Sequence, residues 1–234
     1  RPPRSTLSSS SAASDVYKRQ IIWSVRSECG PEREKNEDAV YPEIGGSDTP
    51  PFKAAVCDGL GGHAKGEVAS NIATSTMKNA ENNIKKIIQD ANTKITEYQE
   101  TSLDSKGMGT TMTGIIIDEN GLMEIGHVGD SRCYILTDRN LVKLTEDQNV
   151  PGYQNVLKQA LGTKEKLDIQ KIDFQLSEGD VVFLCTDGLY NELGEEYLKK
   201  RLQEGVSADT LVGEALLQKP KDNVSGIVIN VVSK

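Results

Sequence analysis

Short apolar runs separated by turn-forming residues dominate the chain from Gln20 onward. This pattern predicts β-strands over residues 20–27, 39–41, 52–58, 111–118, 121–129, 131–137, 141–144, 168–176, 179–187 and 223–232. Polar residues that favour tight turns separate neighbouring runs at 119–121 and 138–140. We also expect the runs at 168–176 and 179–187 to pair as a hairpin across residues 177–179.

A helical period governs residues 67–106, which contain neither glycine nor proline. Apolar residues recur there at helical spacing, from Ala69 to Ile95. They indicate two amphipathic helices with a break near residues 79–83, each with one face for a core and one for water. Further helices are predicted at 153–161, 195–201 and 208–218.

The order of these elements favours an α+β fold, because strands and helices do not alternate as they do in a doubly wound sheet. We expect one domain over residues 20–234, an antiparallel sandwich with helix pairs on its faces. Residues 1–19 include the low-complexity stretch STLSSSSAAS and show no periodicity. We interpret them as a disordered tail or as a remnant that is not native to the protein.

The composition of the chain restricts the kinds of partner that the protein can bind more than it restricts the fold class. Of the 234 residues, 36% are hydrophobic, and the formal net charge is −8. An acidic surface argues against a nucleic-acid partner, because contacts with phosphates need a basic face. No apolar run approaches the roughly 18 residues of a membrane-spanning helix, so we expect no membrane span.

The cysteines, Cys29, Cys57, Cys133 and Cys185, lie far apart in the sequence, in or next to apolar stretches. They form no C-x-x-C pair, so a zinc site is not expected. Unpaired cysteines of this kind are typical of a reducing compartment, and we expect a cytoplasmic protein.

The stretch AAVCDGLGGHAKGEVAS, residues 54–70, places a glycine-rich loop between an apolar strand and a helix. Residues 59–64 match G-x-G-x-x-A, a pattern that can hold the phosphates of a dinucleotide. However, Asp58 stands directly before the first glycine and would repel a pyrophosphate. The helical segment that follows also offers no second strand to carry an acidic residue to the ribose. A dinucleotide enzyme therefore remains only a disfavoured alternative.

Acidic residues recur where the predicted strands begin or end, often beside a glycine. They are Glu37, Asp38, Asp58, Asp130, Asp187 and Asp222. Any one of them has a simpler explanation as a turn or capping residue. As a set they are harder to explain, because clustered carboxylates repel one another unless a cation neutralises them. Oxygen ligands suit hard ions such as Mg²⁺ or Mn²⁺.

An ordered series of motifs resembles the type-2C family of metal-dependent serine/threonine protein phosphatases. The motifs are REKNEDA (33–39), VCDGLGGHAKGEVAS (56–70), MGTT (108–111), HVGDSR (127–132), LTEDQ (144–148), QALG (159–162), CTDGLYNEL (185–193) and DNVSGIVI (222–229). Each motif alone is weak, whereas the whole series in this order is specific. The wording around DGLGG is similar to that of the bacterial branch.

The resemblance implies a four-layer α/β/β/α sandwich with a dinuclear metal site at one edge, occupied by Mn²⁺ or Mg²⁺. In that scheme Asp58 bridges two ions, and the carbonyl of Gly59 is a further ligand. Asp187 and Asp222 complete the shell of the first ion.

The same resemblance assigns the remaining candidates. Glu37 and Asp38 serve the second ion, one of them through water. Asp130 together with Asp187 can hold a third ion in bacterial-type members. Arg33 clamps the substrate phosphate, a task that suits the fork of a guanidinium.

The implied activity is hydrolysis of phosphoserine and phosphothreonine in proteins, by direct in-line attack of a hydroxide that bridges the two ions. Phosphorylated proteins, including a serine/threonine kinase and its substrates, are the implied partners, and we expect a monomer. The alternative function is a catalytically weak pseudophosphatase that binds phosphoproteins. The complete set of acidic residues argues against it.

Two departures from the family pattern stand out. Many eukaryotic members carry histidine after Asp-Gly as the acid for the leaving alcohol, and Leu60 occupies that position here. His63 is interpreted as a capping or surface residue and His127 as a core or sheet residue. Water bound to a metal is then the expected proton donor to the leaving alcohol. The second departure is the short segment 149–158, where the family usually has a longer flap beside the active site.

Overall fold

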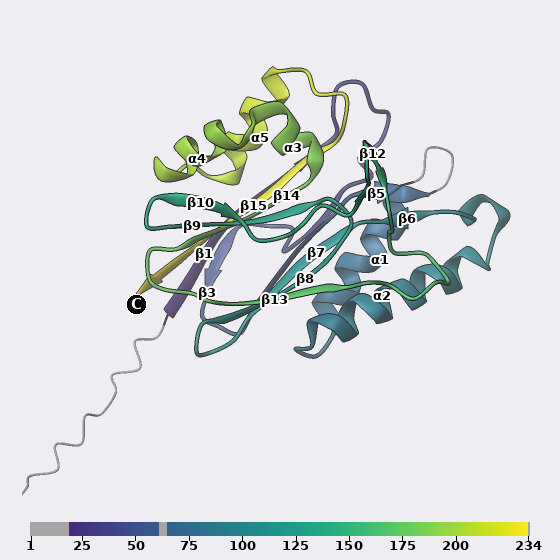
Figure 1. Cartoon of the computed structure of the whole chain (residues 1–234), viewed down its shortest axis with the longest axis horizontal. Helices are drawn as coiled ribbons and strands as arrows, with labels where there is room; N and C mark the ends of the chain where they lie inside the picture. The colour runs from purple at the N-terminus through teal and green to yellow at the C-terminus, as the bar shows by residue number, and fades with distance from the viewer. Residues whose placement is uncertain (1–18, 61–64, 234) are drawn as a thin grey trace, which may run out of the picture.

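Two large antiparallel sheets form the centre of the molecule (Figure 1). The computed structural model describes residues 19–60 and 65–233. The six-stranded sheet has the order β10 (Asn140–Lys143), β9 (Arg132–Thr137), β14 (Val181–Cys185), β15 (Val224–Ser233), β1 (Arg19–Glu28), β3 (Gly46–Asp48). The five-stranded sheet has the order β13 (Gln170–Gln175), β8 (Leu122–Val128), β7 (Met112–Ile117), β4 (Phe52–Cys57), β2 (Ala39–Tyr41).

The remaining elements are two short strand pairs and a set of helices. The pairs are β5 (Gly59–Leu60) with β6 (Gly109–Thr110), and β11 (Asn149–Val150) with β12 (Tyr153–Leu157). The helices are α1 (Gly66–Asn79), α2 (Ile84–Gln99), the 3₁₀ turn η1 (Leu103–Ser105), α3 (Asp187–Leu193), α4 (Glu195–Gln203) and α5 (Ala208–Leu217).

Some strands contribute side chains to two cores, one between the sheets and one between a sheet and its helices. In β14, Val182 and Leu184 face the core between the two sheets, while Phe183 and Cys185 face the helices. Successive side chains of a strand point to opposite faces, so a strand covered on both sides reads as a continuous apolar run. The unbroken run VVFLC in the sequence therefore reflects a strand that is buried on both sides.

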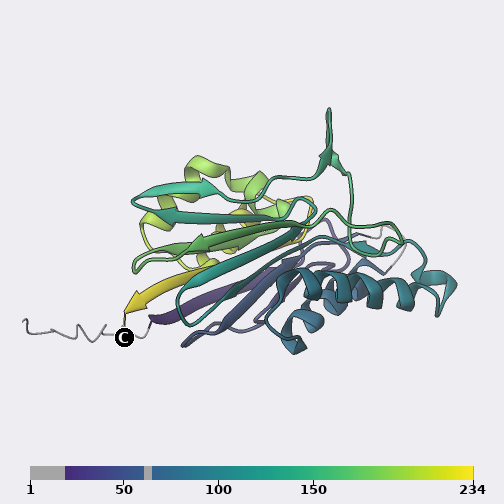
Figure 2. The ribbon, with the colours of Figure 1, turned by 60° about the horizontal axis from the view of Figure 1, so that its bottom comes forward.

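Helices cover the outer faces of both sheets and complete the four layers. An apolar cluster with Ile84, Ile88 and Ile95 packs α1 and α2 against the five-stranded sheet. A second cluster, with Leu189, Leu198 and Leu211, packs α3, α4 and α5 against the six-stranded sheet. Figure 2 shows the helices of residues 66–99 on one side of the sheets and those of residues 187–217 on the other. The predicted α/β/β/α sandwich is confirmed.

The predicted break between the two long helices is confirmed. α1 ends at Asn79 and α2 begins at Ile84. Asn83 caps α2, because its side chain accepts a hydrogen bond from the backbone N–H of Lys86 over 3.1 Å.

Two predictions of local structure were wrong. The segment 153–161 is not a helix: residues 153–157 form β12, which turns back at Gly152 to pair with β11. The strands over 168–176 and 179–187 do not form a hairpin either, because β13 pairs with β8 whereas β14 pairs with β9 and β15. The turn at 177–179 instead carries the chain from one sheet to the other.

β1 begins at Arg19, the last residue of the predicted tail, and residues 1–18 lie outside the described range. None of the described helices is long and apolar enough to cross a membrane. All four cysteines are free thiols, and Cys57, Cys133 and Cys185 are buried.

Candidate active site

A cleft of about 560 Å³ opens at one edge of the sandwich. All but one of the predicted site residues line it: Arg33, Glu37, Asp58, Gly59, Asp130, Asp187 and Asp222. The exception, Asp38, is only 7% exposed, and its pKa still responds to Asp187 and Asp222. The set of acids recognised in the sequence thus converges on one place.

Sheet topology explains this convergence. β4 and β8 both run antiparallel to β7, so their carboxyl ends, followed by Asp58 and Asp130, meet at the same edge. In the other sheet, Cys185 at the end of β14 pairs with Gly226 near the start of β15. That register places Asp187 beside Asp222, and the two sheets present their acids to a common cleft.

The backbone of Asp58 is held by the motif MGTT. Its N–H donates to the Thr111 hydroxyl over 2.9 Å, and its carbonyl accepts from the Thr110 hydroxyl and the Thr111 N–H, each over 2.9 Å. The Thr111 hydroxyl also bonds to that of Ser131 over 2.7 Å. These bonds fix the backbone of Asp58 and thereby restrict the position of its carboxyl group.

Gly59 lies where three backbone segments meet. Its N–H donates to the carbonyl of Glu37 over 3.1 Å. A Cβ at this position would lie 2.4 Å from the Glu37 carbonyl oxygen and 2.5 Å from that of Gly66. Only glycine fits this approach, which brings the start of α1 and the Glu37 loop against Asp58.

Asp38 is fixed by a buried network of hydroxyl groups. Its Oδ2 accepts from the Thr186 hydroxyl over 2.8 Å and from the Ser225 hydroxyl over 2.6 Å. Ser225 and Ser27 share a hydroxyl contact of 2.8 Å, and Asn36 donates to Ser27 over 2.8 Å. One carboxylate oxygen is thus occupied by protein donors, which sets the orientation of the other.

The two charged loops at the mouth of the cleft bond to each other. Arg33 donates from Nη2 to Oδ2 of Asp222 over 2.8 Å and from Nε to the Lys221 carbonyl over 3.0 Å. Asn223 accepts from the Glu37 N–H over 2.9 Å and donates to the Lys35 carbonyl over 3.0 Å. Residues 33–37 and 221–223 therefore form one connected rim.

Asp130 is supported from behind by an aromatic and a guanidinium. Its carbonyl accepts from the Tyr190 hydroxyl over 3.2 Å, and its Oδ2 accepts from the Asn149 side chain over 3.3 Å. The guanidinium of Arg132 lies 3.5 Å from the centroid of the Tyr190 ring and pairs with Asp147 over 2.6 Å. This support links Asp130 to α3 and to β11.

Burial and mutual repulsion raise the pKa values of the acids. Burial, followed by repulsion from Asp130 and Asp222, raises the pKa of Asp187 to about 6, while a hydrogen bond with Asp58 acts in the opposite direction. The pKa of Asp58 is raised well above its usual range by the same two effects. Burial raises the pKa of Asp38 to about 7, although its hydroxyl partners oppose the change.

The donor set fits a divalent cation. Oδ1 of Asp187 is buried and has no hydrogen-bond partner among residues 19–60 and 65–233, and the adjacent carboxyls destabilise one another when ionised. A cation bound by these oxygens removes both costs. Within the described residues, however, no three acidic, histidine or cysteine side chains already form a closed ligand cage. Asp222 and Asp38 bond to protein groups instead, so the individual ligand assignments stay predictions.

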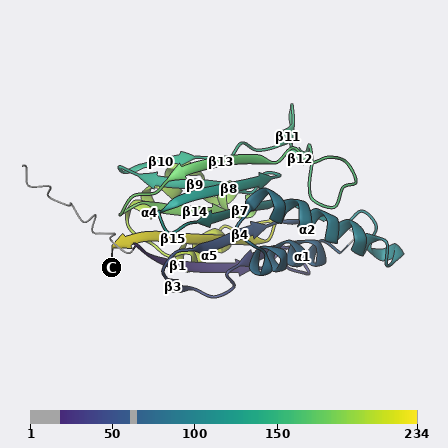
Figure 3. The same cartoon turned by 90° about the horizontal axis from the view of Figure 1, so that it is seen from below.

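The departures from the family pattern fall at the rim. Leu60 lines the cleft and has no proton to donate. His63 lies outside the described residues. His127 is buried between the Thr113 hydroxyl, at 2.8 Å, and the Glu146 carbonyl, at 3.0 Å, so the prediction of a sheet residue is confirmed. Figure 3 shows the shortened flap, β11 with β12, standing out from the body of the molecule, and its Leu157 lines the cleft.

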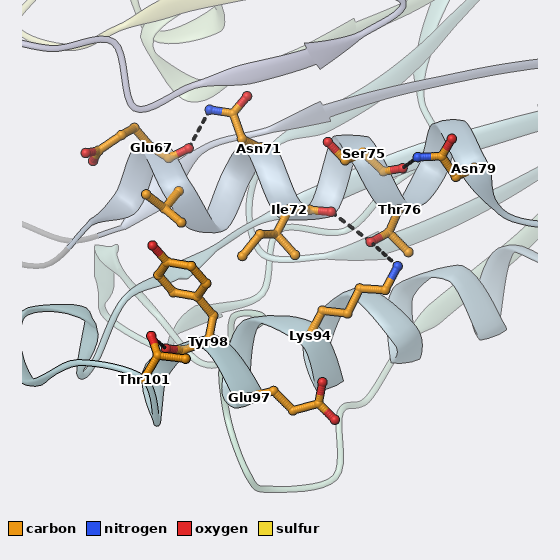
Figure 4. Close-up of a pocket in the computed structure, with 11 residues that line it drawn as sticks. Glu67, Asn71, Ile72, Ser75, Thr76, Asn79, Lys94, Glu97, Tyr98 and Thr101 are labelled. Atoms are coloured by element: carbon orange, nitrogen blue, oxygen red, sulfur yellow. Dashed lines mark hydrogen bonds between the residues drawn. The ribbon is translucent and has the colours of Figure 1, made fainter.

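A roomier groove of about 680 Å³ between α1 and α2 has a different character (Figure 4). Its polar side chains bond mostly to their own helices, as Asn71 does to the Glu67 carbonyl over 2.6 Å and Asn79 to the Ser75 carbonyl over 2.8 Å. Lys94 donates to the Thr76 hydroxyl over 3.3 Å. The groove does not gather the acids, so the chemistry belongs to the cleft.

Five further residues support the site. Thr110, Thr111, Thr186, Asn223 and Ser225 hold the acids without being acids themselves. All five lie inside the motifs quoted above or directly beside a predicted ligand, which was the available signal. The dinucleotide alternative, by contrast, is excluded, because all strand pairings in the described ranges are antiparallel and leave no parallel βαβ unit around residues 54–70.

Solved structures of bacterial serine/threonine phosphatases share this architecture. The chain is similar to the serine/threonine phosphatase PstP/Ppp of Mycobacterium tuberculosis, with a TM-score of 0.81 and 27% identity over 92% of this chain and 100% of that one. It is similar to the PstP catalytic domain in complex with two manganese ions, with a TM-score of 0.79 and 29% identity over 92% of this chain and 100% of that one.

Sequence comparison identifies the family. Residues 31–214 match the family model described as protein phosphatase 2C, and the chain belongs to that family. It is 30% identical to the serine/threonine phosphatase stp of Listeria monocytogenes, over 74% of this chain and 82% of that protein. It is 30% identical to PstP of Mycobacterium tuberculosis, over 91% of this chain but 45% of that protein. The predicted class, a serine/threonine protein phosphatase of bacterial type, is confirmed.

Proposed function

We propose that the chain hydrolyses phosphoserine and phosphothreonine in proteins, with two Mn²⁺ or Mg²⁺ ions held in the acid-lined cleft. The observation that carries the proposal is the convergence of Glu37, Asp58, Asp187 and Asp222 with Arg33 in one cleft. Membership of the protein phosphatase 2C family supports it, as does the manganese complex of the related PstP domain.

The ligand roles follow the family resemblance, and the shared cleft supports them. Asp58 would be shared by two ions. Asp187 and Asp222 would serve one ion, and Glu37 and the Gly59 carbonyl the other.

Two further acids complete the set. Asp38 supports the second ion from behind the cleft wall, through the oxygen that Thr186 and Ser225 leave open. Asp130 with Asp187 offers a place for a third ion. Both assignments rest on position and on the family resemblance.

Divalent ions in such a site lower the pKa of water and neutralise charge on a transferring phosphoryl group. The chain supplies the orientation. Arg33 reaches the mouth of the cleft with a guanidinium whose planar fork matches two phosphate oxygens, and its bond to Asp222 sets the direction of that fork. Leu60 provides no acid, so the proton for the leaving alkoxide comes from water in the cleft.

The partners, oligomeric state and compartment that we propose are those that the sequence implied. Phosphorylated proteins, including a serine/threonine kinase and its substrates, are the partners, and the enzyme acts as a monomer in the cytoplasm. The four free thiols support a reducing compartment.

The decisive experiment is phosphate release from a phosphothreonine peptide with Mn²⁺ present and after chelation. We expect turnover that chelation abolishes and that Asp187→Asn lowers at least about a hundredfold, because the variant removes a charged ligand. Asp173→Asn, an acid on β13 that pairs with Lys171 away from the cleft, is the matched control and keeps full activity. Activity that survives chelation, or an Asp187→Asn enzyme equal to the parent, contradicts the proposal. Binding of Mn²⁺ and peptide without turnover would favour the pseudophosphatase.

A further inference from the structure

A second hollow adjoins the catalytic cleft. It has a volume of about 270 Å³ and shares Leu60 with the cleft, so the two open on either side of one side chain. Residues 107–109 line one side of it, and the segment 158–166, which follows the shortened flap, lines the other. The hollow therefore lies within reach of a substrate segment next to the residue held in the cleft.

Hydrogen bonds within the protein hold the floor of this hollow together. Thr110 and Leu161 exchange two backbone hydrogen bonds, of 3.2 and 2.9 Å. Gln99 donates to the carbonyls of Met108 and Gly162, each over 2.8 Å. Asn92 accepts from the N–H of Gly162 over 2.7 Å. The floor keeps its shape without a ligand.

The charged groups on its walls are different. Lys158 and Lys166 line the hollow and are exposed, and neither takes part in an ion pair within the described residues. Lys164, on the same segment, pairs with Glu100 over 2.9 Å. Glu165 also lines the hollow and offsets one of the two charges. A net positive wall stands here on a chain whose formal net charge is −8.

We propose that this hollow binds an anionic side chain of the substrate, a carboxylate or a second phosphate group, close in sequence to the phosphoresidue being hydrolysed. The inference rests on the proposed function and extends it to a substrate class. An anion in the hollow gains from its net positive charge, and the preformed floor limits the ordering that binding requires. An extended peptide advances about 3.3 Å per residue. If it crosses Leu60, side chains close in sequence to the phosphoresidue reach the hollow.

The test compares phosphothreonine peptides that differ only near the phosphoresidue. A neutral peptide is the reference, and glutamate, lysine or a second phosphothreonine is placed at each of the three positions on either side. We expect the best-placed anion to raise kcat/KM about fivefold, the size expected for exposed charge pairs. The gain should shrink as salt is added, because salt screens exposed charges. The glutamate and phosphothreonine series distinguish the two sources of anion.

Variants locate the effect. Lys158→Gln with Lys166→Gln should abolish the preference while kcat/KM for the neutral peptide and for p-nitrophenyl phosphate stays within about twofold of the parent. Lys164→Gln is the matched control and keeps the preference. Equal rates for all peptides in the parent, or a preference that survives in the double variant, overturns the inference.

The outcomes separate this inference from the proposed function. A parent that hydrolyses every peptide equally lacks the anionic preference but remains a phosphatase. A parent that hydrolyses none of them with Mn²⁺ is not the proposed enzyme. In that case, fluorescence anisotropy of labelled peptides gives the same comparison for binding. A loss of the anionic preference in Lys158→Gln with Lys166→Gln supports the hollow, and unchanged relative affinities overturn it.

Discussion

The guanidinium of Arg33 donates to the carboxylate of Asp222 over 2.8 Å, which joins the proposed phosphate clamp to a proposed metal ligand. Both side chains are partly exposed, at 42% and 35%. Exposed ion pairs contribute little to stability, so the value of this pair lies in orientation rather than in folding. This one contact therefore couples the two proposed functions of the cleft, binding cations and binding phosphate.

Replacing Arg33 should impair turnover and leave the fold unchanged. We expect Arg33→Ala to lower kcat/KM for a phosphothreonine peptide about a hundredfold, because one set of charged donors to the phosphate is lost. Arg33→Lys should fall between, since it keeps the charge and loses the fork. Steady-state kinetics and thermal unfolding measure both effects. Arg26→Ala removes a comparable pair with Glu28 away from the cleft and serves as control. An Arg33→Ala enzyme within twofold of the parent would remove Arg33 from the mechanism.

The hydroxyl of Thr186 should matter for metal binding as well as for folding. Thr186→Val keeps the volume but deprives Asp38 of a donor and the Ser225 N–H of an acceptor. We expect a loss of about 1–3 kcal/mol in the free energy of unfolding and a several-fold weaker affinity for Mn²⁺ by calorimetry. Thr186→Ser retains the hydroxyl and should bind Mn²⁺ like the parent. Equal Mn²⁺ affinities in the two variants would show that the hydroxyl serves packing alone.

The raised pKa values of the acids predict a pH-dependent stability. Burial and repulsion raise the pKa of Asp187 to about 6, and burial raises that of Asp38 to about 7, both above the pKa of about 3.9 of an unperturbed aspartate. A raised carboxyl pKa contributes stability that is present below about pH 4 and lost as the pH rises through the folded value.

Asp187→Asn isolates this effect. Relative to the parent in chelator, the variant should gain on the order of 1–3 kcal/mol between pH 4 and pH 7, because it has no carboxyl to ionise. Mn²⁺ should stabilise the parent more at pH 8 than at pH 5. Urea unfolding across this range gives both quantities. A stability difference between variant and parent that does not change with pH would contradict the placement of Asp187 among repelling acids.

Two glycines should respond to alanine in opposite directions. Gly59→Ala places a Cβ 2.4 Å from the Glu37 carbonyl oxygen, so we expect lower stability and lost activity. Gly213→Ala, within α5, meets only the flexible end of Arg26 at 3.5 Å. It should stabilise the protein by about 0.5–1 kcal/mol, because alanine favours the helix. Urea unfolding of both variants measures this, and a neutral Gly59→Ala would mean that the three backbone segments can separate.

Periodicity in the sequence was enough for the elements with a clear apolar pattern. The two helices over 67–106 and the strands of the sandwich were predicted because each buries a face, or both faces, at its own repeat. The segment 153–161 failed because its helical appearance is local, whereas its pairing with β11 is not. The turn at 177–179 was recognised, but no local signal shows that it changes sheets.

The sequence by itself determined the chemistry of the site: which acids, which arginine and which glycine stand at strand ends in the order of a known family. Only the tertiary structure decided how those groups are held. Asp38 meets Thr186 and Ser225 across separations of 148 and 187 residues, and Arg33 meets Asp222 across 189. Such contacts leave no period in the chain, since they depend on two sheets bringing their ends to the same edge.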